Sequence, residues 1–469
     1  MHRTVGDPPG SGVSSESARP VPGPPGLIEF DTSGPLQVLR RLLDEYGDVV
    51  RYQSSFGPCF LLAHPTHVQA VLRSENYRRS SLIKLILGDG LLASDGAYWR
   101  SQRHLMQGDF LPRRVAPLVP LMARQVERTS REWQDASLLG KDVDVAGAMT
   151  RLTLQIVMAA LFSSELTDQE SVRLCSAVTQ ALDDLGRISW TIFGAPTRFT
   201  PERNAEFLTA RAVIDEVCHE MIARRRRLPA DQRPHDLLTL LIESCEDDQT
   251  LGDRRLRDEM VTMLIGGHET TALALSWAWK ALEEHPEIEA RLHEEVDRVR
   301  VEDAGNGASL SALVWTRAIF QEALRLYPPV WYMARVAIDD DVIDGYPIPR
   351  GACVLVSAWF THRHPRFWQE PERFAPERFL PEQPYAREAY FPFGSGRHTC
   401  LGMHFALLEG TLILALLARS FRLRATNGAE IRPNPGITLR QTPPLRARIE
   451  LRSRRSVESA GQTPCGVAL

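Results

Sequence analysis

The sequence predicts a mainly α-helical protein with a minor β region, folded as a single large domain. Apolar residues recur every three or four positions through long segments, which is the period of an amphipathic helix. Strand patterns are short and few. The chain has 469 residues, 43% of them hydrophobic, which is enough to bury one large core. The expected helices span residues 36–46, 152–161, 204–227, 257–284, 287–301 and 313–326.

Two pairs of short alternating segments predict the minor β region. Residues 49–53 and 59–63 are separated by a glycine-containing turn and are expected to pair. Residues 342–348 and 352–358 flank the turn-forming triplet Pro-Arg-Gly at 349–351, so we expect them to form a hairpin. The β region is therefore expected to be small beside the helical body.

The two ends of the chain differ in composition from the interior. Residues 1–28 are rich in Pro, Gly and Ser and are expected to form a flexible leader, whereas residues 453–469 are polar and unpatterned, as in a disordered tail. A single folded domain is expected to span residues 29–452. No basic patch followed by an apolar segment opens the chain, and no run of about 18 uncharged apolar residues is found. We therefore expect a cytoplasmic protein without a membrane span.

Cysteine usage and charge exclude several other classes. The seven cysteines are scattered without a CxxC pair, which argues against a disulfide framework or a zinc site and favours a reducing compartment. The net charge is −4. The four arginines at 224–227 end an amphipathic helix, where cations complement the helix dipole. No nucleic-acid partner is expected.

The most informative stretch is residues 393–402, which read FGSGRHTCLG. Cys400 lies just before an apolar helix, whose N-terminus would lower the thiol pKa and stabilise negative charge. Gly394, Gly396 and Gly402 would let the backbone approach the sulfur and a flat macrocycle. The alternative is an inert buried cysteine, but that would leave the glycine pattern without a purpose. The loop therefore predicts a thiolate ligand for haem iron.

Two further clusters carry possible chemistry. Residues 266–271, GGHETT, place two glycines inside an expected helix, where each costs about 1 kcal/mol relative to alanine. Either a functional role offsets this cost, or the two glycines are a packing pair beside a helix turn in which threonine hydroxyls donate to backbone carbonyls one turn earlier. Glu322 and Arg325 stand three apart on one helix face, which alone would indicate a surface ion pair.

These segments, in this order, resemble the motifs of the cytochrome P-450 family from about Gly34 to Leu451. Residues 393–402 resemble its haem-binding loop, with Phe393, the glycines and Cys400 at matching positions. Residues 266–271 resemble its oxygen-activation motif, so that Glu269 matches the acid and Thr270 the alcohol that deliver protons, with His268 as a bystander. The resemblance implies the family fold and haem b as the cofactor.

The same resemblance implies roles for residues that hold the haem and its loop. Segment 368–379 matches the family's meander, whose arginine would join the helix pair in a buried structural triad made of Glu322, Arg325 and Arg378. Other positions match ligands of the haem propionates, with His398 replacing the arginine of many members; they are Trp99, Arg103, Arg335 and His398. Segments that line the substrate pocket in relatives are mostly apolar, and the residues expected there are Leu82, Ile86, Ile265, Gly266, Val330, Trp331, Ile437 and Thr438.

The resemblance implies a haem-thiolate monooxygenase that uses O2 and two external electrons to hydroxylate or epoxidise a lipophilic small molecule. A terpenoid, polyketide or fatty-acyl intermediate of secondary metabolism is expected. Because there is no room for a reductase domain after Leu451, electrons are expected from NAD(P)H through a ferredoxin reductase and a ferredoxin. A peroxygenase or an isomerase on the same scaffold is an alternative that the Glu269–Thr270 pair disfavours. A non-catalytic haem sensor is another, but neither terminus has the composition of an output domain.

Overall fold

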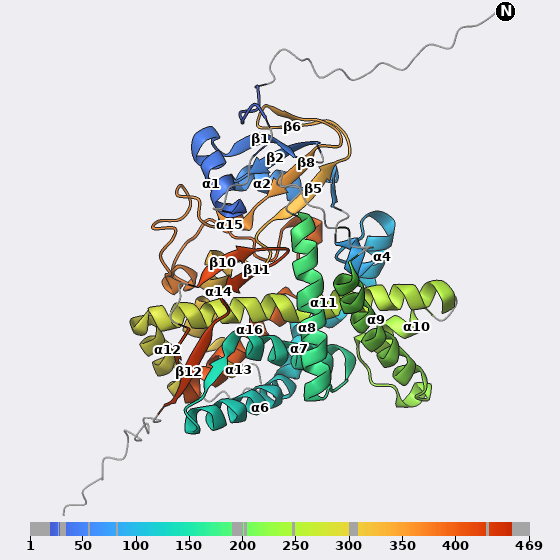
Figure 1. Ribbon diagram of the computed structural model, residues 1–469, viewed down its shortest axis with the longest axis vertical. Helices are drawn as coiled ribbons and strands as arrows, with labels where there is room; N and C mark the ends of the chain where they lie inside the picture. The colour runs from blue at the N-terminus through green and yellow to red at the C-terminus, as the bar shows by residue number, and fades with distance from the viewer. Residues whose placement is uncertain are drawn as a thin grey trace, which may run out of the picture.

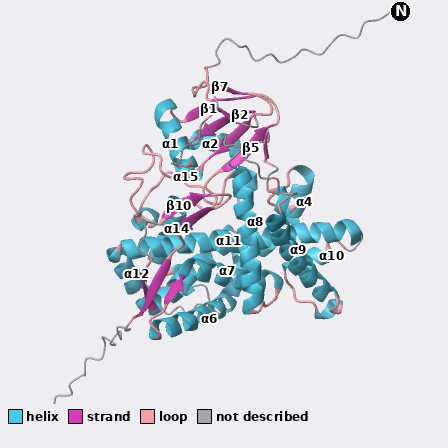
Figure 2. Ribbon diagram, in the orientation of Figure 1, coloured by secondary structure: helices cyan, strands magenta, loops and turns pink. Residues whose placement is uncertain are grey.

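A five-stranded sheet and a larger helical body make up the fold of the computed structural model (Figures 1 and 2). The structure describes residues 19–26, 28, 34–54, 57–80, 83–189, 200, 204–245, 249–299, 308–427 and 431–452. The expected tail 453–469 lies outside the described residues, as does the expected leader 1–28 except for 19–26 and 28, where Arg19 donates to the Gly345 carbonyl and Pro22 accepts from the Arg51 N–H.

Helices account for most of the described chain, as the sequence predicted. They are α1 (Pro35–Tyr46), α2 (Pro65–Arg73), α3 (Lys84–Leu87), α4 (Gly96–Met106), α5 (Pro112–Val115), α6 (Val119–Leu138), α7 (Val145–Phe162), α8 (Asp168–Ser189), α9 (Ala205–Arg226), α10 (Leu237–Glu243), α11 (Gln249–Glu284), α12 (Pro286–Arg298), α13 (Ala308–Ser311), α14 (Val314–Leu326), α15 (Ala358–Thr361) and α16 (Met403–Ser420). Each helix predicted from apolar period is present, although α7 and α11 begin seven and eight residues earlier than expected.

In the part of the chain that the structure describes, the strands form four small sheets. They are β1 (Val49–Ser54), β2 (Gly57–Leu62), β3 (Tyr77–Arg79), β4 (Asp142–Asp144), β5 (Met333–Ala337), β6 (Asp341–Ile343), β7 (Tyr346–Ile348), β8 (Cys353–Val356), β9 (Phe421–Ala425), β10 (Arg432–Pro435), β11 (Leu439–Thr442) and β12 (Arg446–Leu451). The largest sheet has the order β1-β2-β8-β5-β3, and the others are β4-β12-β9, β10-β11 and β6-β7. The predicted pairing of 49–53 with 59–63 is confirmed, because β1 and β2 are antiparallel.

The predicted hairpin between residues 342–348 and 352–358 is wrong. β6 pairs with β7 instead, through a two-residue turn at Asp344 and Gly345, both of which have positive φ. An Asp-Gly pair is a strong signal for such a turn, since its twist matches that of the strands. β8 then leaves for the large sheet, where it runs parallel to β2 and antiparallel to β5.

Helix α11 crosses the helical body, with α8 standing across it and α7 and α16 on its lower side (Figure 1). It packs against both α7 and α16. At Gly267 a side chain would bring its Cβ to 2.8 Å from Val157 Cγ2 of α7, so this glycine sets how closely the two helices approach. The polypeptide after Cys400 continues directly into α16, so the thiol loop and the central helix are mounted on neighbouring elements.

Two helices, α7 and α16, are long and apolar enough to cross a membrane by length and composition. In the structure, 72% and 56% of their residues are buried against the rest of the protein. Core helices of soluble proteins pass the same test, so this finding alone decides neither way.

Candidate active site

A tight loop carries Cys400 between a short 3-10 turn, η9 (Gly396–His398), and helix α16. The Cys400 N–H donates to the Phe393 carbonyl at 2.8 Å and closes the loop. Gly394 and Gly396 both have φ near +70°, which disfavours side chains. A Cβ at Gly396 would also lie 2.6 Å from the Leu72 carbonyl of α2. Gly394 and Gly396 therefore allow the backbone conformation of the thiol loop, and Gly396 also allows its close approach to α2.

The acidity of Cys400 differs from the expectation. The residue as a whole is exposed, yet its sulfur is surrounded by protein atoms, and this burial raises the thiol pKa. The Gly402 N–H and the charge of Arg103 act to lower the pKa, but their effects are smaller. The expected fall in pKa from the helix N-terminus is thus wrong, because desolvation is the larger effect. Coordination to a metal ion would reverse the balance, since it deprotonates a coordinating thiol outright.

Trp99 and Arg103 of α4 face the thiol loop together, as their four-residue spacing predicted. Arg103 Nη1 donates to the Thr399 carbonyl at 2.6 Å, and the Trp99 ring meets the His398 ring edge-on with centroids 4.4 Å apart. The Trp99 Nε1–H is buried without a hydrogen-bond partner. Such an orphaned donor is rare in proteins and is expected where a ligand supplies the acceptor.

His398 and Arg335 lie in the same region but differ in their partners. His398 Nε2 lies 3.1 Å from Asp95 Oδ1, and burial lowers its pKa. Arg335 on β5 is 7% exposed, and burial lowers its pKa to about 10. Its guanidinium donates to the Ala334 carbonyl at 3.0 Å. The residues here fit a haem with carboxylate side chains, because a buried guanidinium and an unpaired indole N–H await acceptors beside an accessible thiol.

On α11, Gly266 and Thr270 share a face that is not covered by packing. Gly266 is exposed, and a Cβ added to it would meet no atom within 4 Å. Thr270 is partly exposed and its hydroxyl donates to the Gly266 carbonyl at 2.9 Å. Of the two glycines, only Gly267 is therefore explained by close packing against a neighbouring helix. His268 points into the core, where its Nδ1 lies 2.6 Å from the Leu264 carbonyl.

Glu269 lies in a buried ion pair that sequence reasoning missed. Arg440 of β11 donates to Glu269 Oε1 from Nε at 2.9 Å and from Nη2 at 2.7 Å, and the Thr438 hydroxyl adds a 3.3 Å bond. The third nitrogen of Arg440 reaches Asp183 Oδ1 on α8 at 2.7 Å. A chain of charges thus runs from the buried Glu269 to Asp183, whose side chain is half exposed. No motif in the sequence links these three positions, because β11 lies far along the chain.

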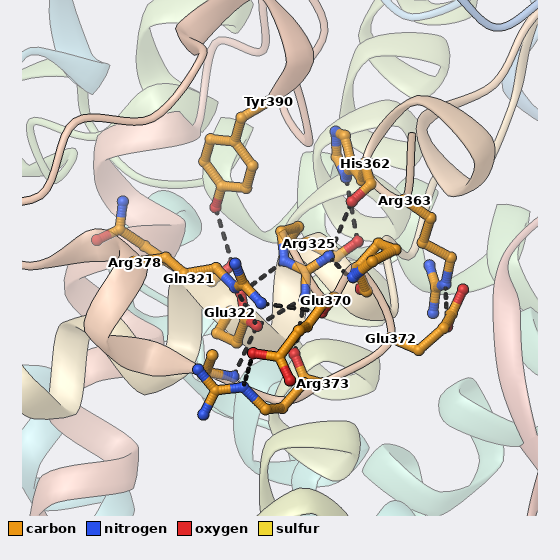
Figure 3. A network of polar contacts seen from close by, with 12 residues as sticks. Gln321, Glu322, Arg325, His362, Arg363, Glu370, Glu372, Arg373, Arg378 and Tyr390 are labelled. Atoms are coloured by element: carbon orange, nitrogen blue, oxygen red, sulfur yellow. Dashed lines mark hydrogen bonds and ion pairs between the residues drawn. The ribbon is translucent and has the colours of Figure 1, made fainter. Parts of the chain in front are cut away.

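The Glu322–Arg325 pair is buried at the centre of a network of polar contacts (Figure 3). Both Arg325 bonds to the Glu322 carboxylate are 2.7 Å long, and both side chains have no exposed surface. Arg325 also donates to the carbonyls of His362, Pro371 and Arg373. The pair is therefore not a surface ion pair. Arg378 is the looser third member, 3.5 Å from Glu322 Oε1.

His362 connects this network to the segment that leads into the thiol loop. Its Nδ1 lies 3.2 Å from the Arg325 carbonyl, and its Nε2 accepts the Phe391 N–H at 3.0 Å. Burial lowers the His362 pKa to about 3, so the ring is neutral and donates from Nδ1. Phe391 is two residues before Phe393. The link was missed from the sequence because a lone histidine between helices has no spacing signal.

The expected pocket residues divide into open and covered positions. Gly266 and Val330 are exposed and Ile437 is partly exposed, whereas Ile86 and Ile265 are buried in the main hydrophobic cluster. Leu82 lies outside the described residues.

Two other expected pocket residues already have partners within the chain. Thr438 is bonded to Glu269, and the Trp331 indole, 1% exposed, donates to the Gly436 carbonyl at 2.8 Å. In this conformation Trp331 supports the β10–β11 hairpin and offers no surface to a pocket.

The helical fold, the thiol loop and the open face of α11 define an oxidoreductase of the haem-thiolate type. The chain belongs to the cytochrome P-450 family, whose model matches residues 19–448. The family, the fold class and the monooxygenase class predicted from the sequence are thereby confirmed.

Bacterial relatives are similar to this chain over most of their length. Cyclooctatin synthase of Streptomyces melanosporofaciens is 33% identical over 418 residues, which cover 87% of this chain and 90% of the relative. Cyclooctat-9-en-7-ol 5-monooxygenase of the same organism is 32% identical, with 86% and 87% covered. Pentalenene oxygenase of Streptomyces avermitilis is 29% identical, with 88% and 92% covered. The names of the last two describe oxygenation of organic molecules.

Proposed function

We propose that this cytochrome P-450 hydroxylates or epoxidises a lipophilic small molecule of the terpenoid, polyketide or fatty-acyl kind in secondary metabolism. The open face of α11 at Gly266 and Thr270 carries this proposal. The names of two relatives, which refer to an alkene and an unsaturated alcohol, support a substrate rich in hydrocarbon.

Haem b is the proposed cofactor, with Cys400 as the iron ligand. The haem, when bound, supplies O2 binding, and electron donation by a thiolate favours cleavage of the O–O bond. Trp99, Arg103, Arg335 and His398 would hold its carboxylates, and Phe393, Gly394 and Gly402 would shape the loop beneath it. The protein contributes orientation and electrostatics.

Thr270 and Glu269 are proposed to handle the protons. The Thr270 hydroxyl, now donating to Gly266, lies on the open face and is free to turn toward an oxygen acceptor. Glu269 faces Arg440 and must leave that ion pair, at least in part, to pass a proton toward Thr270. The Arg440–Asp183 contact would return the pair to its resting state and connect it to the surface.

Electrons are proposed to come from NAD(P)H through a ferredoxin reductase and a ferredoxin. A groove of about 260 Å³ beside α16 joins apolar Val115, Leu407 and Leu408 to Arg317 and His404. Arg113 and Arg114 of α5 are exposed next to it. Because α16 starts just after Cys400, this cationic rim fits an acidic iron–sulfur protein. Arg317→Glu should then raise the KM for ferredoxin more at low salt than at high salt, with no change in substrate affinity.

We propose that the protein works in the cytoplasm without a membrane span, with α7 and α16 as core helices. The test of the function begins with the reduced carbon monoxide complex of purified holoprotein. Its red-shifted Soret band should be present in the wild type and lost in Cys400→Ser, because a hydroxyl donates poorly to iron. A variant that keeps the band would remove Cys400 as the ligand.

Turnover separates the monooxygenase from its alternatives. NADH use with a surrogate ferredoxin system, dissolved O2 and compounds chosen by their Soret shift should give an oxygenated product. Product formed from peroxide but not from NADH would indicate a peroxygenase. Product without any oxidant would indicate an isomerase, and no product with any compound that shifts the spectrum would favour a sensor.

A further inference from the structure

Two cysteines that are far apart in the sequence are neighbours in the large sheet. Cys59 of β2 and Cys353 of β8 are in-register partners of the parallel ladder that joins these strands (Figure 1). Neighbouring strands lie about 4.8 Å apart, which is inside the range of about 4.4–6.8 Å that separates the Cα atoms of disulfide-bonded cysteines. Both side chains pack into the same hydrophobic cluster, so they lie on one face of the sheet. The fold therefore makes a cysteine pair that the spacing along the chain conceals.

The two thiols interact directly, and polar groups surround the sulfur of Cys59. The Cys353 thiol hydrogen-bonds with the Cys59 thiol. Cys59 Sγ also donates to the Ser54 hydroxyl oxygen at 3.3 Å, and that hydroxyl donates onward to the Gly57 carbonyl at 3.0 Å. Tyr52, which stands opposite Cys59 on β1, forms a further hydrogen bond with the same thiol. Three side chains can therefore stabilise a thiolate at this position.

These contacts separate the acidity of Cys59 from that of other buried cysteines. The hydrogen bond from Cys353 is the largest effect on Cys59, and it holds the pKa of this thiol below its usual value although burial opposes it. In Cys175 and Cys218, which are also buried, desolvation raises the pKa to about 12. Cys59 in turn raises the pKa of Cys353. Because the thiolate is the nucleophile, one sulfur of the pair is prepared to react while the other keeps its proton.

The pair is open to small molecules through Cys353. Cys59 is 1% exposed, whereas Cys353 is partly exposed. A peroxide is small enough to enter beside Cys353, and the proposed monooxygenase would itself release hydrogen peroxide whenever O2 is reduced without product. In a reducing compartment a disulfide is usually transient and typical of redox sensing. The geometry, the acidity and the exposure therefore all favour a reversible oxidation at this place.

We propose that Cys59 and Cys353 form a reversible disulfide when a peroxide oxidises them, and that this bond fastens β2 to β8. The Cys59 thiolate attacks one peroxide oxygen, the O–O bond breaks, and the released hydroxide leaves as water, which gives a sulfenic acid. The Cys353 sulfur then attacks the Cys59 sulfur, and the second oxygen leaves as water with the Cys353 proton. The two thiols lose two electrons together, and hydrogen peroxide becomes two waters. A small thiol reverses the step by exchange.

Peptide mapping tests the proposal on wild-type protein. Holoprotein is treated with hydrogen peroxide, its remaining thiols are blocked with N-ethylmaleimide, and the chain is digested with trypsin. The peptides 52–73 and 351–363, each with one of the two cysteines, should then appear as one species that is two hydrogens lighter than their sum. Dithiothreitol should return the separate peptides. Two blocked cysteines, or two cysteines oxidised separately to sulfinic acids, would overturn the proposal.

Gel mobility with variants identifies the bonded cysteines independently. A bond between such distant positions keeps the denatured chain compact, so the oxidised wild type should migrate faster in a non-reducing denaturing gel. Cys353→Ser should keep the mobility of the reduced chain after the same treatment. Cys175→Ser is the matched control, since it removes a buried cysteine of α8, and it should shift like the wild type. A shift that persists in Cys353→Ser would contradict the proposal.

The rate of thiol loss tests whether the pair is selectively reactive. Samples are withdrawn at intervals after addition of peroxide, unfolded, and labelled with an isotope-coded alkylating reagent, so that each cysteine is followed separately. Cys59 and Cys353 should disappear together, because one disulfide consumes both. Their loss should be at least about tenfold faster than that of Cys175 or Cys218, since reactivity follows the thiolate fraction. Equal rates for all four cysteines would show unselective oxidation and would count against the pair.

Discussion

Two buried clusters of charge differ in whether the chain completes them. In the Glu322–Arg325 network every strong donor of the arginine meets a carboxylate or a carbonyl of the protein. Arg335 of β5 stands opposite Arg79 of β3 in the strand ladder, the guanidinium bonds of both go to backbone carbonyls, and the Trp99 indole N–H has no partner. The completed cluster is a structural support, whereas the incomplete one has the character of a binding site. Burial alone does not distinguish the two clusters. They differ in how many of their charged and polar groups have a partner within the protein.

The largest effect is expected from breaking the completed cluster. Arg325→Ala should lower the free energy of unfolding by about 3–5 kcal/mol and give little folded holoprotein, because Glu322 stays buried without its partner. Arg373→Ala is the control, since its half-exposed side chain makes surface ion pairs while only its backbone carbonyl meets Arg325. That variant should stay within about 0.5 kcal/mol of the wild type in urea unfolding. Similar stabilities for both variants would contradict the distinction drawn above.

Acidification should act on the same cluster through His362. Its folded pKa of about 3 lies below the usual value of 6.5, so below pH 6.5 the unfolded chain takes up a proton that the folded protein refuses. Stability contributed by the neutral ring is complete above pH 6.5 and is lost as the pH falls toward 3. His362→Gln, whose amide can replace both hydrogen bonds, should flatten the stability profile between pH 4 and 6 by up to about 1.4 kcal/mol per pH unit. Parallel profiles in chemical unfolding would show that His362 is not the titrating group.

The incomplete cluster should respond in the opposite direction when the cofactor is absent. Arg335→Met in haem-free protein should leave the unfolding free energy unchanged or raise it by about 1–2 kcal/mol, because it removes a buried cation that lacks a carboxylate partner. With haem bound, the same variant should be less stable than the wild type. Urea unfolding of both forms checks the change of sign, and a large loss of stability in the haem-free variant would place Arg335 among the structural supports.

The smallest effect on stability is expected at Thr270, which belongs to neither cluster. Thr270→Ala removes one hydrogen bond on an open helix face, so the cost should be below about 1 kcal/mol. Haem and substrate binding should persist, while product per NADH falls and hydrogen peroxide per NADH rises, because protons are no longer directed. Unchanged coupling on an accepted substrate would take Thr270 out of the proposed mechanism and reopen the peroxygenase alternative.

Features encoded within a short stretch were predictable, and those assembled from distant segments were not. Apolar period gave the helices, and the spacing around Cys400 gave the thiol loop with its glycines. Contacts such as Arg440 with Glu269 or Arg79 with Arg335 require the order of the strands. The mistaken hairpin after β6 shows the same limit, because the partners of β8 are β2 and β5. The thiol pKa was mispredicted for a related reason: the helix dipole is a local property, whereas desolvation depends on the whole surroundings.

The large sheet has a consequence for how the protein is made. Strands β1, β2 and β3 leave the ribosome early, but β5 and β8 are synthesised only after most of the helical body. Because chain synthesis takes seconds and non-local strand pairing is slow, the sheet closes late. Arg335 and Cys400, both proposed to hold the haem, therefore emerge only with the final third of the chain. Cells should accordingly accumulate nascent chains that are helical yet unable to retain cofactor, and haem supply should limit yield only after translation ends.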